Sequence, residues 1–180
     1  MLPLCRSSRC IEAKKNRLPV DLFWNSAKAA LRRGDVCIGV TEAGRPVGYV
    51  WFAFGNTPHI HGAWVRLAAG ARYLYKAFIR PQYRGRRIGP EMYVRGSALC
   101  PRRGRTFGVL AVDLDNTRGL RASRRAGWSQ IGLAGFLRIP GRILPLRSPS
   151  ARRYGFAFFG KDDRRENKSG ATASSAPATT

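Results

Sequence analysis

Acidic residues are scarce in this sequence: 10 aspartates and glutamates stand against 33 lysines and arginines, giving a formal net charge of +23 at pH 7. Such a polycation repels polyamines unless their pocket is locally acidic, so we do not expect polyamine substrates. The excess charge favours contact with polyanions, nucleic acid among them. The arginines are spread along the chain without a DNA- or RNA-binding motif, so nucleic acid is a secondary expectation.

Long hydrophobic runs are also missing. None approaches the roughly 18 residues that a membrane-spanning helix needs, and the first residues lack the apolar centre of a secretory signal. We therefore expect a soluble, cytoplasmic protein without a membrane partner. With 180 residues, 44% of them hydrophobic, the chain is long enough to fold as a globular domain around its own core.

Cysteine and histidine are too few and too scattered to indicate a disulfide-bridged or metal-bound fold. The cysteines form neither a disulfide framework nor a Cys-x-x-Cys pair, so free thiols are expected. The histidines, His59 and His61, match no common zinc spacing with them, and we expect no metal. The cysteines are Cys5, Cys10, Cys37 and Cys100.

Hydrophobic patterning predicts an alternation of strands and helices. A helix is expected from Asp21 to about Arg33, followed by a hairpin of strands at residues 36–41 and 46–54. The later expected elements are a long loop over 55–71, a strand at 72–80, a helix at 90–100, a strand at 106–113, a helix at 117–126, and an antiparallel pair formed by 128–139 and 153–159 around a proline-rich connection.

These elements fall within residues 20–160, which we expect to form one domain. Residues 1–19 match no element clearly. Only Leu2 to Cys5 could form a strand there, and we expect a start that is either truncated or misassigned. Residues 161–180 are polar and then rich in Ser, Ala and Thr, so we expect a disordered tail.

The most informative stretch is residues 79–89, where a strand ends, a basic loop follows and a helix begins. Free backbone amides at a helix start, with the positive end of the helix dipole, form an anion site that usually binds phosphate. Gly85 and Gly89 carry no Cβ, so the backbone can approach a ligand closely. The arginines from Arg84 to Arg87 add positive charge that suits phosphate. A solvated basic turn is the alternative, because the glycine spacing matches neither common nucleotide-binding loop.

Two motifs within residues 72–128 resemble those of the GNAT superfamily of N-acetyltransferases. The family's cofactor motif, Arg/Gln-x-x-Gly-x-Gly/Ala at a strand-to-helix junction, corresponds to residues 84–89, with Arg87 in place of its middle glycine. A second pattern runs Asn, a small residue, Tyr and Gly-Phe, and here Ser123 replaces the Tyr. Its positions in this chain are Asn116, Gly119, Ser123, Gly127 and Trp128.

The resemblance implies an α/β fold of GNAT type, with a central, mostly antiparallel sheet and helices on both faces. It also implies acetyl-CoA as the acyl donor, held where the strand before the loop splays from the strand after its helix. The Phe78 amide would then lie near the thioester oxygen, and Asn116 would contact the cofactor or cap the helix that follows it. The implied cofactor-binding residues are Ala77, Phe78, Ile79, Arg84, Gly85, Arg86, Arg87, Ile88, Gly89 and Asn116.

Candidates for proton transfer are fewer. An alkyl ammonium has a pKa of about 10.4 and must lose a proton before its nitrogen attacks a thioester. Many family members carry a carboxylate on the strand that here ends at Arg80, and this strand has none. The candidates are Ser123 at the Tyr position, His61 in the 55–71 loop, and Asp113 at the end of the following strand.

Two functional hypotheses remain open. The first is an N-acetyltransferase that acetylates a primary amine of a small molecule or protein. The alternative is a catalytically degenerate GNAT-fold module that binds CoA or an acidic partner such as nucleic acid. Arg87, Ser123 and the missing strand carboxylate favour the alternative. The sequence specifies neither the acceptor nor the oligomeric state.

Overall fold

The computed structural model describes residues 4–6, 24–60 and 62–160. The expectations for Asp21 and for the tail at 161–180 therefore lie outside the described residues. Contacts divide the chain into two compact units. Among the described residues, the first comprises those up to Gly55 and Ala69–Gln130, and the second comprises those within Asn56–Ala68 and 131–160.

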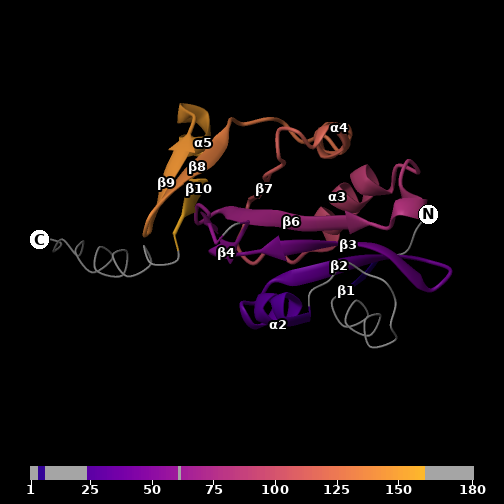
Figure 1. The fold of residues 1–180 in the computed structure, drawn as a ribbon. Coiled ribbons are helices and arrows are strands. Elements are labelled where there is room, and N and C mark those ends of the chain that lie inside the picture. Colours follow the sequence, from indigo (N-terminus) through magenta and orange to yellow (C-terminus); the bar gives the residue numbers. More distant parts are fainter. Residues whose placement is uncertain (1–3, 7–23, 61, 161–180) are drawn as a thin grey trace, which may run out of the picture. The chain divides into compact units, whose positions relative to one another are not determined.

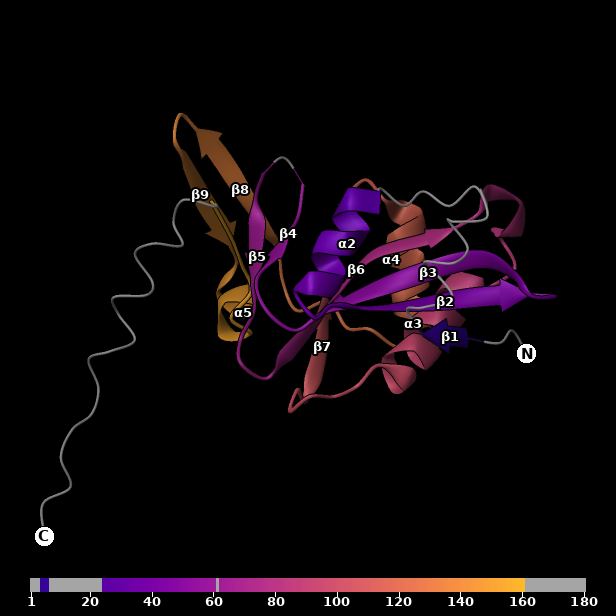
Figure 2. The ribbon, with the colours of Figure 1, turned by 90° about the horizontal axis from the view of Figure 1, so that it is seen from below.

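The first unit is built on a five-stranded sheet with the strand order β1-β2-β3-β6-β7 (Figure 1). Neighbouring strands are antiparallel except β6 and β7, which are parallel. Helix α2 lies on one face and helices α3 and α4 on the other (Figures 1 and 2), so the expected fold class is confirmed. The elements are β1 (Leu4–Arg6), α2 (Trp24–Arg32), β2 (Val36–Glu42), β3 (Arg45–Ala53), β6 (Ala71–Ile79), the 3-10 helix η1 (Pro81–Tyr83), α3 (Ile88–Leu99), β7 (Phe107–Leu110) and α4 (Thr117–Arg125).

The predicted hairpin is formed by β2 and β3, whose bounds differ from the expected ones by one residue at three of the four ends. Ala43 and Gly44 connect the strands, and both have positive φ, 46° and 76°. A two-residue turn with this backbone matches the right-handed twist of the strands it joins. Gly48 of β3 pairs with Ile79 of β6, so the hairpin turn and the carboxyl end of β6 lie at the same end of the strands.

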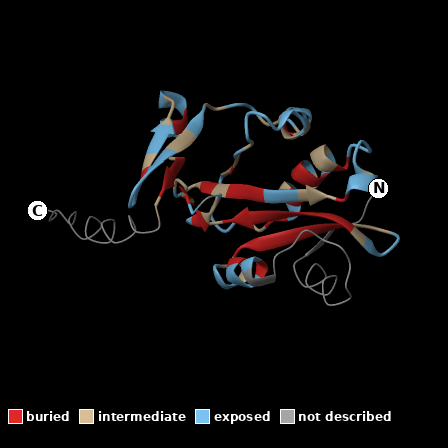
Figure 3. Ribbon diagram, viewed as in Figure 1, coloured by how far each residue is buried: buried red, intermediate tan, exposed pale blue. Residues whose placement is uncertain are grey.

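The main core lies between this sheet and α3. Side chains of β2 and β3, Ile38, Val50 and Phe52 among them, pack against Met92 of α3 and are almost fully buried. Figure 3 shows buried residues concentrated along β2, β3 and the amino half of β6. Burial of this apolar surface holds α3 on the sheet and so positions its first turn.

A buried carboxylate precedes β2. The Tyr75 hydroxyl donates a hydrogen bond of 2.6 Å to Asp35 Oδ2, and Arg33 Nη2 donates another of 2.8 Å. Burial raises the pKa of Asp35 above its usual value of 3.8, although the hydrogen bonds from Tyr75 and Arg33 act in the opposite direction. Asp35 thus accepts a hydrogen bond from Tyr75 of β6, a strand that contains no carboxylate of its own.

The second unit differs from expectation in its pairing. The predicted loop over 55–71 contains strands β4 and β5, and β5 pairs with β10. The expected partners at 128–139 and 153–159 do not pair with each other, because β8 forms a hairpin with β9. The proline-rich connection itself supplies β9, where Pro145 is accommodated because an outer strand tolerates a missing amide. The elements are β4 (Thr57–Pro58), β5 (Trp64–Arg66), β8 (Ala134–Ile139), β9 (Arg142–Arg147), α5 (Pro149–Arg153) and β10 (Ala157–Phe159).

Two features are absent from the residues that the structure describes, a membrane-spanning helix and a metal-binding cluster. None of the helices there is both long and apolar enough to cross a membrane. No group of three or more His, Cys, Asp or Glu side chains in the same part of the chain is arranged to hold a metal ion.

Candidate functional site

Strands β6 and β7 pair only at their amino ends. Their parallel register runs from Ala71 opposite Phe107 to Leu74 opposite Leu110. Strand β7 then ends, three residues earlier than the predicted strand, whereas β6 continues to Ile79. The carboxyl half of β6 is therefore unpaired on its β7 side among the described residues, which is the splayed arrangement expected from the resemblance.

A β-bulge interrupts β6 where it leaves β7. Tyr49 of β3 pairs with Phe78 and Trp51 pairs with Tyr75, so the single residue between the β3 partners faces two residues of β6. One of these two, Lys76, has a positive φ of 47°. A bulge bends its strand and redirects the residues beyond it. The sequence gives no signal for this bulge, since a lysine rarely adopts that conformation.

Two contacts fix the direction of the β6 backbone beyond the bulge. The Arg80 amide donates to a β3 carbonyl at 2.9 Å, and a Cβ on Gly48 would lie 2.7 Å from the Phe78 carbonyl. Alternate residues of a strand direct their amide and carbonyl to the same side, so Phe78 faces β3 and Ile79 faces the open side. There the Ile79 carbonyl accepts a hydrogen bond of 3.1 Å from Arg84 Nε.

The loop between η1 and α3 presents consecutive free amides. Within the described residues, none of the backbone amides from Gly85 to Gly89 donates a hydrogen bond, and the first bond inside α3 joins the Glu91 amide to the Arg87 carbonyl. Helix α3 begins at Ile88. Pro90 is therefore its third residue, whereas the predicted helix began at Pro90. The missing N–H of Pro90 still costs no bond, because the first amides of a helix have no partner inside it.

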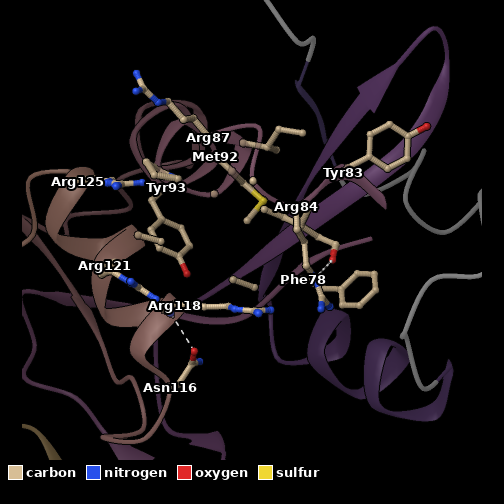
Figure 4. A pocket seen from close by; sticks show the side chains of 18 residues that line it. Phe78, Tyr83, Arg84, Arg87, Met92, Tyr93, Asn116, Arg118, Arg121 and Arg125 are labelled. Atoms are coloured by element: carbon tan, nitrogen blue, oxygen red, sulfur yellow. Dashed lines mark hydrogen bonds between the residues drawn. The ribbon is translucent and has the colours of Figure 1, made fainter. Parts of the chain in front are cut away.

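A cavity of about 750 Å³ is bounded by the end of β6, this loop, α3 and α4 (Figure 4). It contains every predicted cofactor-binding residue except Arg86. Its lining residues are Ala77, Phe78, Ile79, Tyr83, Arg84, Gly85, Arg87, Ile88, Gly89, Pro90, Met92, Tyr93, Asn116, Arg118, Gly119, Arg121, Ala122 and Arg125.

The lining of the cavity is cationic. Among the residues that the structure describes, five arginines line it and no aspartate or glutamate does. Three of them, Arg118, Arg121 and Arg125, follow one another at intervals of three and four residues along α4, which places them on one helix face. Sequence reasoning missed these three, although that spacing marks them as one stripe. Free amides and arginines together favour a ligand with several negative charges.

The comparison with protein families decides the classification. Residues 6–128, more than half of the chain, match the family described as acetyltransferase (GNAT). The chain belongs to the GNAT family. No curated protein matches the sequence at a significant level.

Several solved structures share the fold at low sequence identity. AAC(6')-Iy in complex with the bisubstrate analog CoA-S-monomethyl-acetylneamine is 12% identical with a TM-score of 0.59, and the match covers 77% of this chain and 98% of that one. The aminoglycoside 6'-N-acetyltransferase AAC(6')-Ih from Acinetobacter baumannii is 11% identical with a TM-score of 0.55, over 77% and 98% of the two chains. A transcriptional regulator from Bacillus halodurans C-125 is 13% identical with a TM-score of 0.54, over 77% and 100%. At these identities the likeness concerns the fold alone.

Arg87 occupies the position of the middle glycine of the GNAT motif and keeps a backbone conformation typical of glycine. It precedes α3 with φ 57° and ψ 14°, the left-handed conformation, which a glycine adopts without strain. For a residue with a Cβ this conformation costs about 1–2 kcal/mol. The Arg87 side chain lines the cavity, so the strained residue lies within the candidate site.

Arg86 is the predicted cofactor-binding residue that lies outside the GNAT cavity. Its guanidinium donates to both carboxylate oxygens of Glu42, at 2.5 and 3.2 Å, and lies 5.4 Å from the centre of the Tyr83 ring. The hydrogen bond to Glu42 raises the pKa of Arg86. Its side chain thus ties the loop to the β2–β3 hairpin.

Ser123 and Asp113, two of the three predicted catalytic residues, do not line the cavity. Ser123, at the position of the GNAT Tyr, is buried, donates its hydroxyl to the Leu120 carbonyl at 3.0 Å, and does not line the cavity. Asp113 is exposed beyond the end of β7 and lines no part of the cavity. His61 lies outside the described residues. Asn116 both lines the cavity and caps α4, since its Oδ1 accepts the Gly119 amide at 2.8 Å.

Proposed function

We propose that this GNAT protein transfers an acetyl group from acetyl-CoA to a primary amine of a small molecule or protein. The observation that carries the proposal is the run of free amides from Gly85 to Gly89 beside the unpaired end of β6. The amides suit a diphosphate, and an unpaired strand edge suits a chain with amide groups, such as pantetheine.

The cofactor would bind along the cavity from the loop to the bulge. Amides of Gly85 to Gly89 would hold the diphosphate, and the lining arginines would offset its charge. The pantetheine arm would pair with the side of β6 to which Ile79 turns. The Phe78 backbone faces β3. The amide of Ala77 or Ile79, and not that of Phe78, would therefore donate a hydrogen bond to the thioester oxygen.

Acetyl-CoA supplies the reactive thioester carbonyl. In the transfer, the amine nitrogen forms a bond to that carbon, the carbon–sulfur bond breaks, and the amine gives up a proton. Asp113 and His61 remain the proposed acceptors of this proton. Ser123 is not proposed as the donor to the thiolate, because its hydroxyl already donates to Leu120. The leaving thiol has a pKa of about 8.5, as a free cysteine does, so its thiolate departs with water as the acid.

The acceptor is proposed to be an amine of low positive charge. The aminoglycoside acetyltransferases of similar fold support a small-molecule amine. Aminoglycosides are themselves polycations, however, and a chain with a net charge of +23 repels such molecules at low ionic strength. A neutral or anionic molecule with one free amine meets no such barrier.

Calorimetry with acetyl-CoA and a thiol-release assay over a panel of amines test the proposal. We expect saturable binding of acetyl-CoA and release of CoA thiol with at least one amine. Folded protein that binds no acetyl-CoA at millimolar concentration would overturn the proposal entirely. Binding without turnover on any amine would overturn the enzymatic part and favour the alternative binding module.

A further inference from the structure

The arginines of the cavity gather at two ends. In Figure 4, Arg87 and Arg125 lie at one end, whereas Arg118 extends from α4 toward Arg84 and Phe78 at the other. Phe78 belongs to the part of β6 that is unpaired toward β7. In this view, Arg87 and Arg125 lie at the end of the cavity opposite Phe78.

Among the described residues, the side chains of Arg87 and Arg125 have no protein partner. Both are exposed, and neither guanidinium forms a hydrogen bond or ion pair within the described residues. An arginine cannot relieve repulsion by losing its proton. Two permanent cations at one end of a cavity without a carboxylate favour an anion between them.

The backbone gives a second, independent indication. Arg87 is held in a left-handed conformation at the position where the GNAT motif has a glycine. Strained backbone conformations cluster at ligand-binding and active sites. A glycine would fit the loop better, so the reason for an arginine lies in its side chain.

The identity of the anion follows from the proposed function, on which this inference rests. If the amides at 85–89 hold the diphosphate and β6 receives the pantetheine, then the adenosine part of the donor extends away from β6. The anionic group on that part is the 3'-phosphate, a monoester with a second pKa of about 6 and so close to two charges at pH 7. We propose that Arg87 and Arg125 bind this 3'-phosphate and make the protein selective for CoA over dephospho-CoA.

The test compares binding of CoA and dephospho-CoA by calorimetry in wild type and three variants. Wild type should bind CoA at least about tenfold more tightly than dephospho-CoA, because phosphate–arginine hydrogen bonds are charge-assisted. Arg87→Ala and Arg125→Gln should each reduce this ratio to about threefold or less, chiefly by weakening CoA binding.

Arg124→Gln is the matched control. Arg124 lies in the same last turn of α4 as Arg125 and is exposed, but it does not line the cavity. Its removal subtracts the same charge at the same helix end, so the ratio should stay at the wild-type value.

The possible failures are distinguishable. Equal binding of both ligands by wild type would overturn this inference and leave the proposed function standing. Equal weakening of both ligands by Arg87→Ala would show that Arg87 binds the diphosphate, which also overturns it. Binding of neither ligand by folded wild type would overturn the proposed function and this inference with it.

Discussion

Arg86 and Glu42 form an ion pair across 44 residues of sequence, with both carboxylate oxygens accepting from one guanidinium. Glu42 ends β2 and Arg86 lies in the middle of the amide-bearing loop. The pair therefore joins the loop to the hairpin, and the positive charge of Arg86 is already matched within the protein.

This pairing predicts unequal roles for two loop arginines. Arg84→Gln should weaken acetyl-CoA binding about tenfold or more, because a charged hydrogen bond contributes about 1.5–3 kcal/mol and Arg84 lines the cavity. Arg86→Gln removes an equal charge two residues away and should weaken binding by less than about threefold. Calorimetry measures both, and equal losses would show that Arg86 leaves Glu42 to reach the ligand.

The left-handed conformation of Arg87 predicts a gain in stability from glycine. Arg87→Gly should raise the free energy of unfolding by about 0.5–1 kcal/mol, since the strain removed exceeds the extra chain entropy of glycine. Arg87→Ala keeps a Cβ and should show no such gain. Urea denaturation measures both variants, and a glycine variant that is less stable than the alanine variant would contradict the assignment of strain.

Substitution of Ser123 by alanine should have little effect on kcat or on stability. Its hydroxyl donates to Leu120 and stays inside α4, so Ser123→Ala should change kcat by less than about twofold, whereas loss of a true general acid costs about 100-fold or more. The stability change should stay within about 1 kcal/mol, the value of one hydrogen bond. Steady-state thiol release provides the measurement, and a hundredfold drop in kcat would restore Ser123 as the acid.

Asp35 predicts a definite pH dependence of stability. Its folded pKa is raised above the usual 3.8 by burial, so between these two values the folded protein keeps a proton that the unfolded chain has released. Relative to Asp35→Asn, wild type should therefore lose stability as the pH rises from about 4 through the folded pKa, with no further change above it.

Urea unfolding of wild type and Asp35→Asn at a series of pH values provides the measurement. The asparagine keeps an oxygen that can accept the Tyr75 hydroxyl, so the comparison isolates the titration. A stability difference that moves in favour of wild type as the pH rises would show that pairing with Arg33 and Tyr75 outweighs burial.

The parts of the fold that could be predicted from sequence are those specified by local patterns. The β2–β3 hairpin has its turn at Ala43 and Gly44, and α4 has its cap at Asn116. The order of strand, basic loop and helix around Gly85 was also readable, because glycine and arginine carry that signal within a few residues.

What could not be predicted depends on contacts between distant residues. Strand β5 is only three residues long and pairs with β10 about ninety positions later, so no local pattern distinguishes it from a loop. The partner of Arg86 is likewise remote. The bulge at Lys76 has no local signal either, since tertiary pairing imposes a conformation that lysine disfavours.

The early end of the β6–β7 pairing has a consequence for the behaviour of the free protein in solution. Between Tyr75 and Ile79, β6 carries backbone groups that no neighbouring strand satisfies on the β7 side among the described residues. Such an edge is a template for any extended peptide, including one from another copy of the chain. If acetyl-CoA occupies this edge, as proposed, it competes with that association, so we expect added acetyl-CoA to reduce self-association at high protein concentration.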